Sequence, residues 1–458
     1  MSSAQGVPAS ASGAEDMTAH RHPAPCPVPD VAGGVCDPGH MDQLPGAEDV
    51  GAYLKRTCLR DFGPPPDGEA DSESYRTKLD RDDVPVPRLL RSALVIAGFA
   101  AYGPGEKVEW WVNFTYRGHP CALAHEKFGV RLYVHTDSGE DAAADLSARI
   151  VRKLLAAVRA VEKLIVEAAP QLLGRGEATV ANQHHVLRRA FDYFRDRAEH
   201  PTFIPDVKTE YQTPPGLVTK SFGYSSGGAH MAVNAFHDLV AALTAYVSAL
   251  EHALVLALPF RGFDPDKEDL TGIIGARWGE KWERVLGKDE EANTYRARLA
   301  EVVERWRNPY SHGGFEKGHG STIYLHTPGV GAVPIGLTGV RSSPRFTLFP
   351  ASESDIGAVF VLLDELDTWL SIRLPEAMRW INSGLPVRYD EAFRTDLTEA
   401  LAVGRFERFL EYHSYRQDQV DNMDYQASRL STLKPAHLQA RATSSRTCSR
   451  SSSGTTPG

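Results

Sequence analysis

The sequence predicts a mainly α-helical protein in which a small α+β domain precedes a helical bundle. Apolar residues recur at helical spacing over long segments, most clearly in residues 141–169 and 232–258. Residues 107–136 instead hold short runs of aromatic and β-branched residues, which are typical of strands. The chain is 458 residues long, which is too long for one ordinary core, so we expect two or three folded units.

Changes in composition divide the chain into seven segments. The two ends lack apolar periodicity and are rich in Pro, Gly, Ser or Thr, so we expect both to be disordered. Breaker residues such as TPPG and SSGG mark a linker between the two main domains. The expected segments are a disordered tail (1–48), a short helix and linker (49–83), an α+β sensing or targeting domain (84–213), a linker (214–231), the helical bundle (232–389), a helical extension (390–434) and a disordered tail (435–458).

The elements of the α+β domain follow from periodicity. In residues 141–169, Ile150, Leu154 and Val161 share one helical face. We expect three strands, with a turn at Gly118–Pro120 between the first two. The predicted helices are 88–101, 141–169 and 180–197, and the predicted strands are 107–116, 121–123 and 129–136.

The bundle is predicted to begin with the apolar helix 232–258, which ends at Pro259. A strand-prone insertion covers residues 321–349. Pro375 is expected to break or kink the helix 354–374, and a shorter helical piece is expected to continue to Trp380. The other predicted helices are 274–286, 293–306, 354–374 and, in the extension, 390–410.

The distribution of charge along the chain limits the kinds of ligand that we expect. The net charge of -9 comes almost entirely from residues 1–84, which hold 7 Lys+Arg against 15 Asp+Glu. The rest of the chain is nearly neutral, which argues against a broad basic face for long nucleic acid but allows a narrow basic cleft.

Five cysteines without a CxxC pair fit a reducing compartment. We expect no secretory signal and no membrane span, because Glu251 and His252 interrupt the apolar segment 241–260, and therefore a soluble, cytoplasmic protein.

The stretch EVVERWRNPYSHGGFEKG, residues 301–318, carries the candidate chemistry. Leu299, Val303, Trp306 and Tyr310 are spaced by four, three and four residues, which predicts an apolar seam facing the core. Arg307 lies next to this seam, and Asn308-Pro309 is expected to disturb the helix. Five residues after Arg307, His312 then follows on a short turn that Gly313-Gly314 ends.

This Arg-Asn-x3-His-Gly pattern at a helix end resembles the Arg-x4–6-His motif of the HEPN superfamily, the higher-eukaryote and prokaryote nucleotide-binding fold. The apolar helix AYVSALEHALVLALPF is similar to that family's opening helix, and the matching parts cover residues 232–382. Pro309 inside the motif and the insertion after Gly318 depart from the family pattern. The first departure puts the position of His312 in doubt, and the second is expected to cap or shape the site.

The resemblance implies a metal-independent endoribonuclease that needs no cofactor and acts in toxin–antitoxin or antiviral defence systems. Arg307 and His312 would be catalytic, Asn308 would orient the pair or touch phosphate, and Tyr310 would either stack on a base or belong to the core. Arginine grips phosphate oxygens and histidine exchanges protons near neutral pH, so these residue types suit RNA cleavage. HEPN ribonucleases act as dimers, which implies a homodimer with two facing motifs in one cleft, RNA as substrate, and an antitoxin or trigger as partner.

Two other functions remain open. A non-catalytic HEPN module would serve dimerisation or nucleotide binding. An interaction protein would bind its partner through the first domain and use the bundle as a scaffold.

Other residue groups are weaker candidates. One helix carries a basic stripe away from its apolar face, formed by Arg149, Arg152, Lys153, Arg159 and Lys163. Such a stripe is usually a solvated helix face, but it is also the best candidate for RNA backbone contact outside the bundle. Possible metal ligands gather near the predicted hairpin and in the N-terminal tail, but strand alternation and cysteine spacing disfavour a metal site in either place. The hairpin group is His119, Cys121, His125 and Glu126, and the tail group is His20, His22, Cys26, Cys36 and His40. His184 and His185 are adjacent on a helix and point about 100° apart. No GxxxxGK[ST], GxGxxG or GxSxG pattern supports a nucleotide or serine-hydrolase site.

Overall fold

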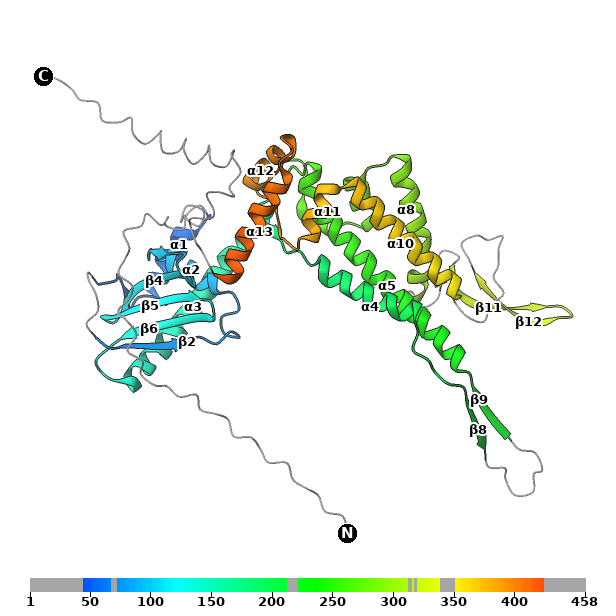
Figure 1. Cartoon of the computed structure of the whole chain (residues 1–458). Helices are drawn as coiled ribbons and strands as arrows, with labels where there is room; N and C mark the ends of the chain where they lie inside the picture. The colour runs from blue at the N-terminus through cyan, green and yellow to red at the C-terminus, as the bar shows by residue number, and fades with distance from the viewer. Residues whose placement is uncertain are drawn as a thin grey trace, which may run out of the picture. The chain divides into compact units, whose positions relative to one another are not determined.

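The computed structural model describes residues 44–66, 72–211, 221–311, 315–316, 319–337 and 351–423. These residues divide into two compact units. Unit 1 reaches Pro170 and includes the residues from Asp418 on, and unit 2 runs from Gln171 to Gln417. The fold is mostly helical, with small antiparallel sheets (Figure 1). The predicted tails lie outside the described residues, apart from residues 44–48, and α1 begins within that short stretch, at Ala47.

Unit 1 is built on an antiparallel sheet with the strand order β1-β4-β5-β6-β2, to which β3 adds by pairing with β4. Alternate residues face the core, as strand geometry requires, and Val112, Leu123 and Leu132 lie opposite one another with no exposed surface. The strands are β1 (Phe62–Gly63), β2 (Ser74–Lys78), β3 (Ala101–Tyr102), β4 (Val108–Tyr116), β5 (His119–Glu126) and β6 (Gly129–His135). Arg117 and Gly118 make the β4–β5 turn with positive φ, so Pro120 belongs to the strand and not to the turn we predicted.

Three helices bury their apolar sides against this sheet face: α1 (Ala47–Arg56), α2 (Pro87–Ile96) and α3 (Glu140–Gly174). The stripe predicted on α3 is confirmed, since Ile150, Leu154 and Val161 are fully buried in the same core. The α+β character predicted for this part of the chain is therefore present.

The predicted boundaries of the first domain are wrong. Residues 49–83 do not form only a short helix and linker, because β2 pairs along its whole length with β6 at the sheet edge. α4 (His184–Glu199), predicted for the first domain, belongs to unit 2. Its Phe191 is fully buried and contacts the rings of Tyr246 and Phe360, so apolar packing against unit 2 decides where α4 belongs.

The predicted linker 214–231 is also wrong in its second half. β8 (Val207–Tyr211) pairs with β9 (Ser221–Ser225), and α5 (Gly227–Leu256) begins two residues later. Ser226 caps α5 by accepting a hydrogen bond from the backbone N–H of Ala229. Residues 212–220 lie outside the described residues.

Unit 2 is a helical bundle around α5. The predicted break before Pro375 and the short helix after it are confirmed: Pro375 is the first residue of its own helix, where its missing N–H costs nothing. The helices that follow α5 are η2 (Leu258–Arg261), α6 (Leu270–Gly275), α7 (Trp278–Leu286), α8 (Glu290–Val302), η3 (Val303–Arg307), α9 (Asn308–Ser311), α10 (Glu353–Arg373), α11 (Pro375–Asn382), α12 (Glu391–Ala402) and α13 (Phe406–Asn422). A three-stranded sheet of β10 (Phe315–Glu316), β11 (His319–Thr327) and β12 (Gly331–Leu337) begins before the strand-prone insertion predicted for residues 321–349 and continues into it. β7 (Thr179–Val180) pairs with β13 (Val387–Arg388).

α5 is long and apolar enough to cross a membrane, but two thirds of its most apolar window is buried inside the protein. Its charged side chains have partners in the bundle: Glu251 forms an ion pair of 2.7 Å with Lys281, and Asp238 pairs with Arg197 at 3.1 Å. These are the features of a buried core helix.

Candidate functional site

The helix that carries the predicted motif changes its winding just before Arg307. α8 continues into η3, a π-helical turn in which the backbone N–H of Asn308 donates to the carbonyl of Val303, five residues earlier. The next residue, Pro309, has no N–H, so the α-helical bond to the carbonyl of Arg305 cannot form. The wide turn accommodates the disturbance that Asn308-Pro309 was predicted to cause, and the helix then continues to Ser311.

Arg307 is the last residue of this π-helical turn and is half-buried. Its Nη1 donates a hydrogen bond of 3.2 Å to Oδ1 of Asn308, which is also half-buried. Asn308 therefore restrains one end of the guanidinium, and its predicted role of orienting the pair or touching phosphate stays a prediction. His312, the other predicted catalytic residue, lies outside the described residues.

Tyr310 does not continue the apolar seam. Leu299, Val303 and Trp306 are buried as predicted, but Tyr310 is 57% exposed. The π-helical turn spans five residues per hydrogen bond instead of four, so the residues after it fall on a different face from the one that α-helical spacing predicts. Of the two roles considered for Tyr310, membership of the core is wrong, and stacking on a base stays a prediction.

The exposed ring of Tyr310 meets the first turns of α5. Its centroid lies 5.7 Å from the ring of His237 and 6.3 Å from the ring of Phe236. Phe236 also contacts Trp306 in the buried part of the seam, at 6.4 Å. Sequence reasoning missed both α5 residues, because nothing local connects residues 236–237 with the motif.

Arg305, on the same π-helical turn, lines an open pocket of about 200 Å³ between the α8–η3 helix and α10. Its guanidinium lies 4.4 Å from the centre of the Trp306 ring and 3.6 Å from Oδ1 of Asp355. Arg298 and Glu301 also line the pocket, so cations and carboxylates are balanced there. This lining does not offer the excess of positive charge that a phosphate group requires.

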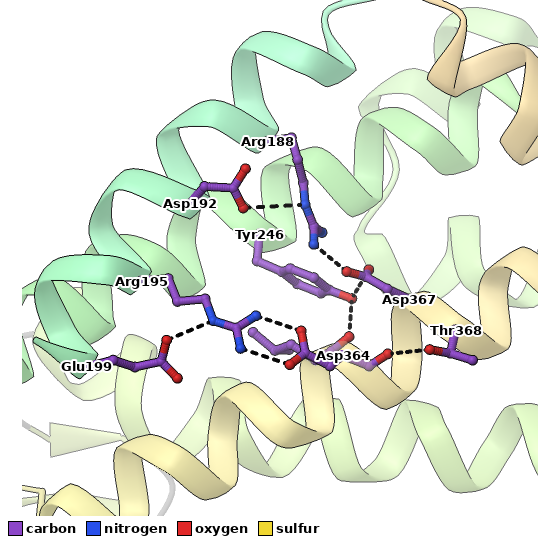
Figure 2. Close-up of polar contacts among 9 residues, drawn as sticks. Arg188, Asp192, Arg195, Glu199, Tyr246, Asp364, Asp367 and Thr368 are labelled. Carbon is purple, nitrogen blue, oxygen red and sulfur yellow. Dashed lines mark hydrogen bonds and ion pairs between the residues drawn. The ribbon is translucent and has the colours of Figure 1, made fainter.

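A second polar cluster holds α4 against α5 and α10 (Figure 2). Arg188 pairs with Oδ2 of Asp367 at 2.5 Å, and the hydroxyl of Tyr246 donates to Oδ1 of the same carboxylate at 2.8 Å. Arg195 makes two hydrogen bonds, of 2.6 and 2.8 Å, to Asp364. Burial raises the pKa of Tyr246 well above its usual value, so the hydroxyl stays a donor.

Sequence reasoning missed this cluster as well. The sequence pattern that could have predicted the cluster is the spacing of residues of like charge. Arg188 and Arg195 are seven residues apart, and Asp364 and Asp367 are three apart, so each pair shares a helix face. Every arginine in the cluster is matched by a carboxylate, and we assign the group to holding the helices together.

The basic stripe predicted on α3 is only partly available for RNA. Arg152 and Arg159 are exposed. Arg149 is also exposed but pairs with Asp145 at 2.6 Å, and Lys153 pairs with Asp61 at 3.0 Å. The hydrogen bond from Lys153 is the main cause that lowers the pKa of Asp61. Lys153 therefore joins α3 to the β1 region, and its predicted place in an RNA-binding stripe is not supported.

The residues considered as metal ligands in unit 1 are engaged in separate contacts. Nδ1 of His125 lies 2.6 Å from Oε2 of Glu109, and Glu126 accepts a hydrogen bond from Tyr133. Cys121 is buried in the core, and burial raises the pKa of its thiol to about 12. Within the part of the chain that the structure describes, no three His, Cys, Asp or Glu side chains converge on a metal site.

His184 and His185 do not act together. His184 is buried, and burial lowers its pKa to about 4, whereas Nε2 of His185 lies 2.9 Å from the carbonyl oxygen of Asn382. Both residues contribute to packing where α4 begins.

No family model, curated protein or solved structure matches this chain.

The motif region combines groups that suit a nucleic-acid ligand. Arg307 supplies a permanent positive charge, Asn308 an amide beside it, and Tyr310 an exposed ring. A guanidinium binds phosphate oxygens in a forked geometry, and an aromatic face stacks on an unpaired base.

Proposed function

We propose that this chain is a metal-independent endoribonuclease of the HEPN type, an RNA-cleaving effector in defence or toxin–antitoxin biology. The observation that carries the proposal is the position of Arg307 at the end of a π-helical turn, where Asn308 restrains it and His312 follows five residues later. π-Helical turns inside α-helices are frequent at functional sites.

The chemistry needs little beyond these side chains. RNA carries its own nucleophile, the 2′-hydroxyl, next to the scissile phosphate. Arg307 would neutralise the charge that grows on the phosphate oxygens, and His312 would exchange a proton with one of the reacting oxygens. The products would be a 2′,3′-cyclic phosphate and a 5′-hydroxyl.

The surroundings are consistent with this proposal. Unit 2 is a helical bundle with an apolar central helix, and the motif follows α8 within it. The three-stranded sheet after the motif lengthens the connection to α10 and would cap the site or shape its substrate. A homodimer, a cytoplasmic location and an antitoxin or trigger partner are further parts of the proposal.

The test is to incubate the purified full-length protein with total RNA in excess EDTA and to map the new ends. We expect cleavage with 5′-hydroxyl ends. Arg307→Ala and His312→Ala should each lower the rate by about 10²-fold or more, since both groups act in the transition state. Arg298→Ala and His230→Ala are matched controls that remove an arginine from α8 and an exposed histidine from α5.

Folding of each variant is checked by circular dichroism. Full cleavage by either motif variant, or strict dependence on added magnesium or manganese, would overturn the proposal. If RNA is bound but never cut, the chain is a non-catalytic binding module instead.

A further inference from the structure

The two faces of the unit 1 sheet differ in character. One face supplies the buried residues that form an apolar core with α1, α2 and α3. Strand alternation turns every second residue of β4 and β6 to the opposite face, where Trp111 and Tyr133 are only half-buried and lie outside that core. Packing against the helices therefore does not account for the large side chains on this outer face.

The register of the strands places aromatic and basic side chains in one row across the outer face. Tyr102 of β3 lies opposite Trp111 of β4. Ala124 of β5 comes next, and Arg131 of β6 then lies opposite Lys78 of β2 at the sheet edge. Because Ala124 is small, no large side chain of β5 separates the rings from the cations in this row.

The neighbouring row has the same character. Ala122 of β5 lies opposite Tyr133 of β6, and Tyr133 lies opposite Arg76 of β2. Strands are about 4.8 Å apart, so both rows lie within a patch about 20 Å wide. We call this surface the outer sheet face, and it is formed by Tyr102, Trp111, Tyr133, Arg76, Lys78 and Arg131.

The aromatic rings of the outer sheet face are held in position. Tyr102 and Trp111 stack on one another, with their centroids 5.9 Å apart and their planes inclined by 22°. Tyr102 is 41% exposed, so a further flat ring can extend the stack. The hydroxyl of Tyr133 donates a hydrogen bond to Glu126, which fixes the third ring. Aromatic side chains fixed on the surface of a sheet bind single-stranded nucleic acid by stacking on its unpaired bases.

The cations of the outer sheet face are not neutralised by carboxylates. Arg76 and Lys78 are exposed, and within the part of the chain that the structure describes Nη1 of Arg131 has no hydrogen-bond partner. None of the three forms an ion pair among the described residues. Glu126 shares this face, but its carboxylate accepts the hydrogen bond from Tyr133. The surface is therefore positively charged beside its aromatic rings, which complements a chain of bases and phosphates.

We propose that the outer sheet face binds a short stretch of single-stranded RNA. Bases would stack on the Tyr102–Trp111 pair and on Tyr133, and phosphates would lie near Arg76, Lys78 and Arg131. Three cations are too few to hold a long polyanion, so stacking would supply most of the affinity, in agreement with the nearly neutral charge of the chain. The inference gives the predicted sensing or targeting domain an RNA ligand, and it does not depend on the proposed function.

The test measures binding of a probe that cannot be cleaved through its 2′-hydroxyl. The probe is a fluorescent 2′-O-methyl oligoribonucleotide of mixed sequence and about eight nucleotides, and its anisotropy is followed with the full-length protein. We expect Trp111→Ala and Tyr102→Ala each to raise Kd by about 5-fold to 100-fold, the effect of losing one stacked base. Tyr53→Ala is the control, because it removes an exposed tyrosine from α1, on the other side of the sheet, and should keep the wild-type Kd.

Folding of each variant is checked by circular dichroism. Tyr102 lies on an edge strand that pairs only with β4 among the described strands, so Tyr102→Ala keeps the test decisive if Trp111→Ala is unstable. A Kd of wild-type size in a folded Tyr102→Ala or Trp111→Ala would overturn the inference.

Salt dependence tests the cations. Each phosphate contact with a single strand contributes about 0.7 to the slope of log Kd against log salt concentration, so the double variant Arg76→Gln/Lys78→Gln should lower the slope by about 1.4. Arg56→Gln, at an exposed arginine of α1, should leave the slope unchanged. An unchanged slope in the double variant would show that these cations do not contact phosphate and would overturn the inference.

A duplex competitor tests the preference for unpaired bases. An RNA duplex of the same sequence should compete about tenfold less well than the single strand, because its bases already stack on one another. Equal competition would mean that the protein contacts only the backbone, and the stacking site would be rejected.

This inference and the proposed function fail separately. If the probe binds through the outer sheet face but the wild-type protein cuts no RNA, the inference stands and the ribonuclease proposal is rejected. If Arg307→Ala weakens binding while Trp111→Ala and Tyr102→Ala do not, RNA is held at the motif region and the inference is rejected. Failure of the wild-type protein to bind the probe would also reject the inference.

Discussion

The hydroxyl of Tyr246, in the middle of α5, donates a hydrogen bond of 2.8 Å to Oδ1 of Asp367 on α10. The tyrosine is 2% exposed, and the other oxygen of the carboxylate receives Arg188 from α4. One carboxylate thus joins three helices of unit 2 through two charge-assisted hydrogen bonds.

Tyr246→Phe tests how much this junction contributes. The substitution keeps the ring but removes the donor, so we expect the free energy of unfolding of unit 2 to fall by about 1–3 kcal/mol. Urea denaturation followed by circular dichroism measures the change. Tyr193→Phe is the control, because that tyrosine is 58% exposed and its hydroxyl lies 3.4 Å from Arg197, so we expect an effect of about 0.5 kcal/mol or less. Equal effects of the two substitutions would show that the Tyr246–Asp367 bond contributes nothing specific.

The lowered pKa of Glu109 predicts that the stability of unit 1 depends on pH. The hydrogen bond with His125 and the contacts with Arg88 lower the pKa of Glu109 from 4.5 to about 2. Between these values the unfolded chain binds a proton that the folded chain does not. The stabilisation from Glu109 is therefore complete above about pH 4.5 and is lost as the pH falls toward 2.

The measurement is thermal unfolding of the wild type and Glu109→Gln across this range. We expect the difference in stability between the two proteins to shrink as the pH is lowered. A difference that stays constant down to the lowest pH at which the wild type is folded would contradict the assignment.

The lowered pKa of His413 predicts that the stability of unit 2 also depends on pH. Its ring lies 4.4 Å from that of Phe409 and 5.3 Å from that of Trp380, and burial lowers its pKa from 6.5 to about 4. The folded protein keeps this histidine neutral where the unfolded chain would protonate it. Stability should therefore fall as the pH decreases from about 6.5 to 4.

His413→Phe removes the titrating group but keeps an aromatic ring, so we expect a shallower loss of stability over this range, measured by urea denaturation at several pH values. His200→Phe, at a side chain that is 76% exposed, should leave the wild-type slope unchanged. His184 titrates in the same direction and is present in all three proteins, so some slope will remain.

Pro309→Ala separates stability from function at the π-helical turn. Alanine restores the backbone donor that proline lacks, so we expect the melting temperature to stay the same or to rise. If the wide turn sets the direction of Tyr310 and of the residues after it, cleavage of RNA should fall. Melting curves and the cleavage assay are run on the same preparation. Unchanged cleavage would mean that the turn has no part in the site.

A mixed dimer tests whether the sites are independent. Differently tagged wild-type and His312→Ala chains are co-expressed, and the heterodimer is purified through both tags. Because the two copies of His312 would face one another in one cleft, we expect the heterodimer to be nearly inactive, well below half of the wild-type rate. Half of the wild-type rate would instead mean that each chain cuts RNA independently, and the composite site would be rejected.

The local elements of this protein were largely predictable. Periodicity located α3, α5 and α10, and the runs of β-branched and aromatic residues located β4 and β6. The proline at residue 309 correctly indicated a disturbed helix, but the form of the disturbance, a π-helical turn, depended on how the backbone redistributed its hydrogen bonds. The exposure of Tyr310 follows from that form, and the prediction of a continuous seam failed there.

The sequence by itself determined most of the longer helices and the central strands β4 and β6, and it located Arg307 and Asn308 near a helix end, because periodicity, capping and proline effects act over a few residues. Only the tertiary structure decided that α4 joins unit 2, that Asp367 meets Arg188 from 179 residues away, and that His237 lies beside Tyr310. These pairings depend on which apolar faces pack together across the whole unit. No local pattern records that choice, so these contacts could be found only in the folded chain.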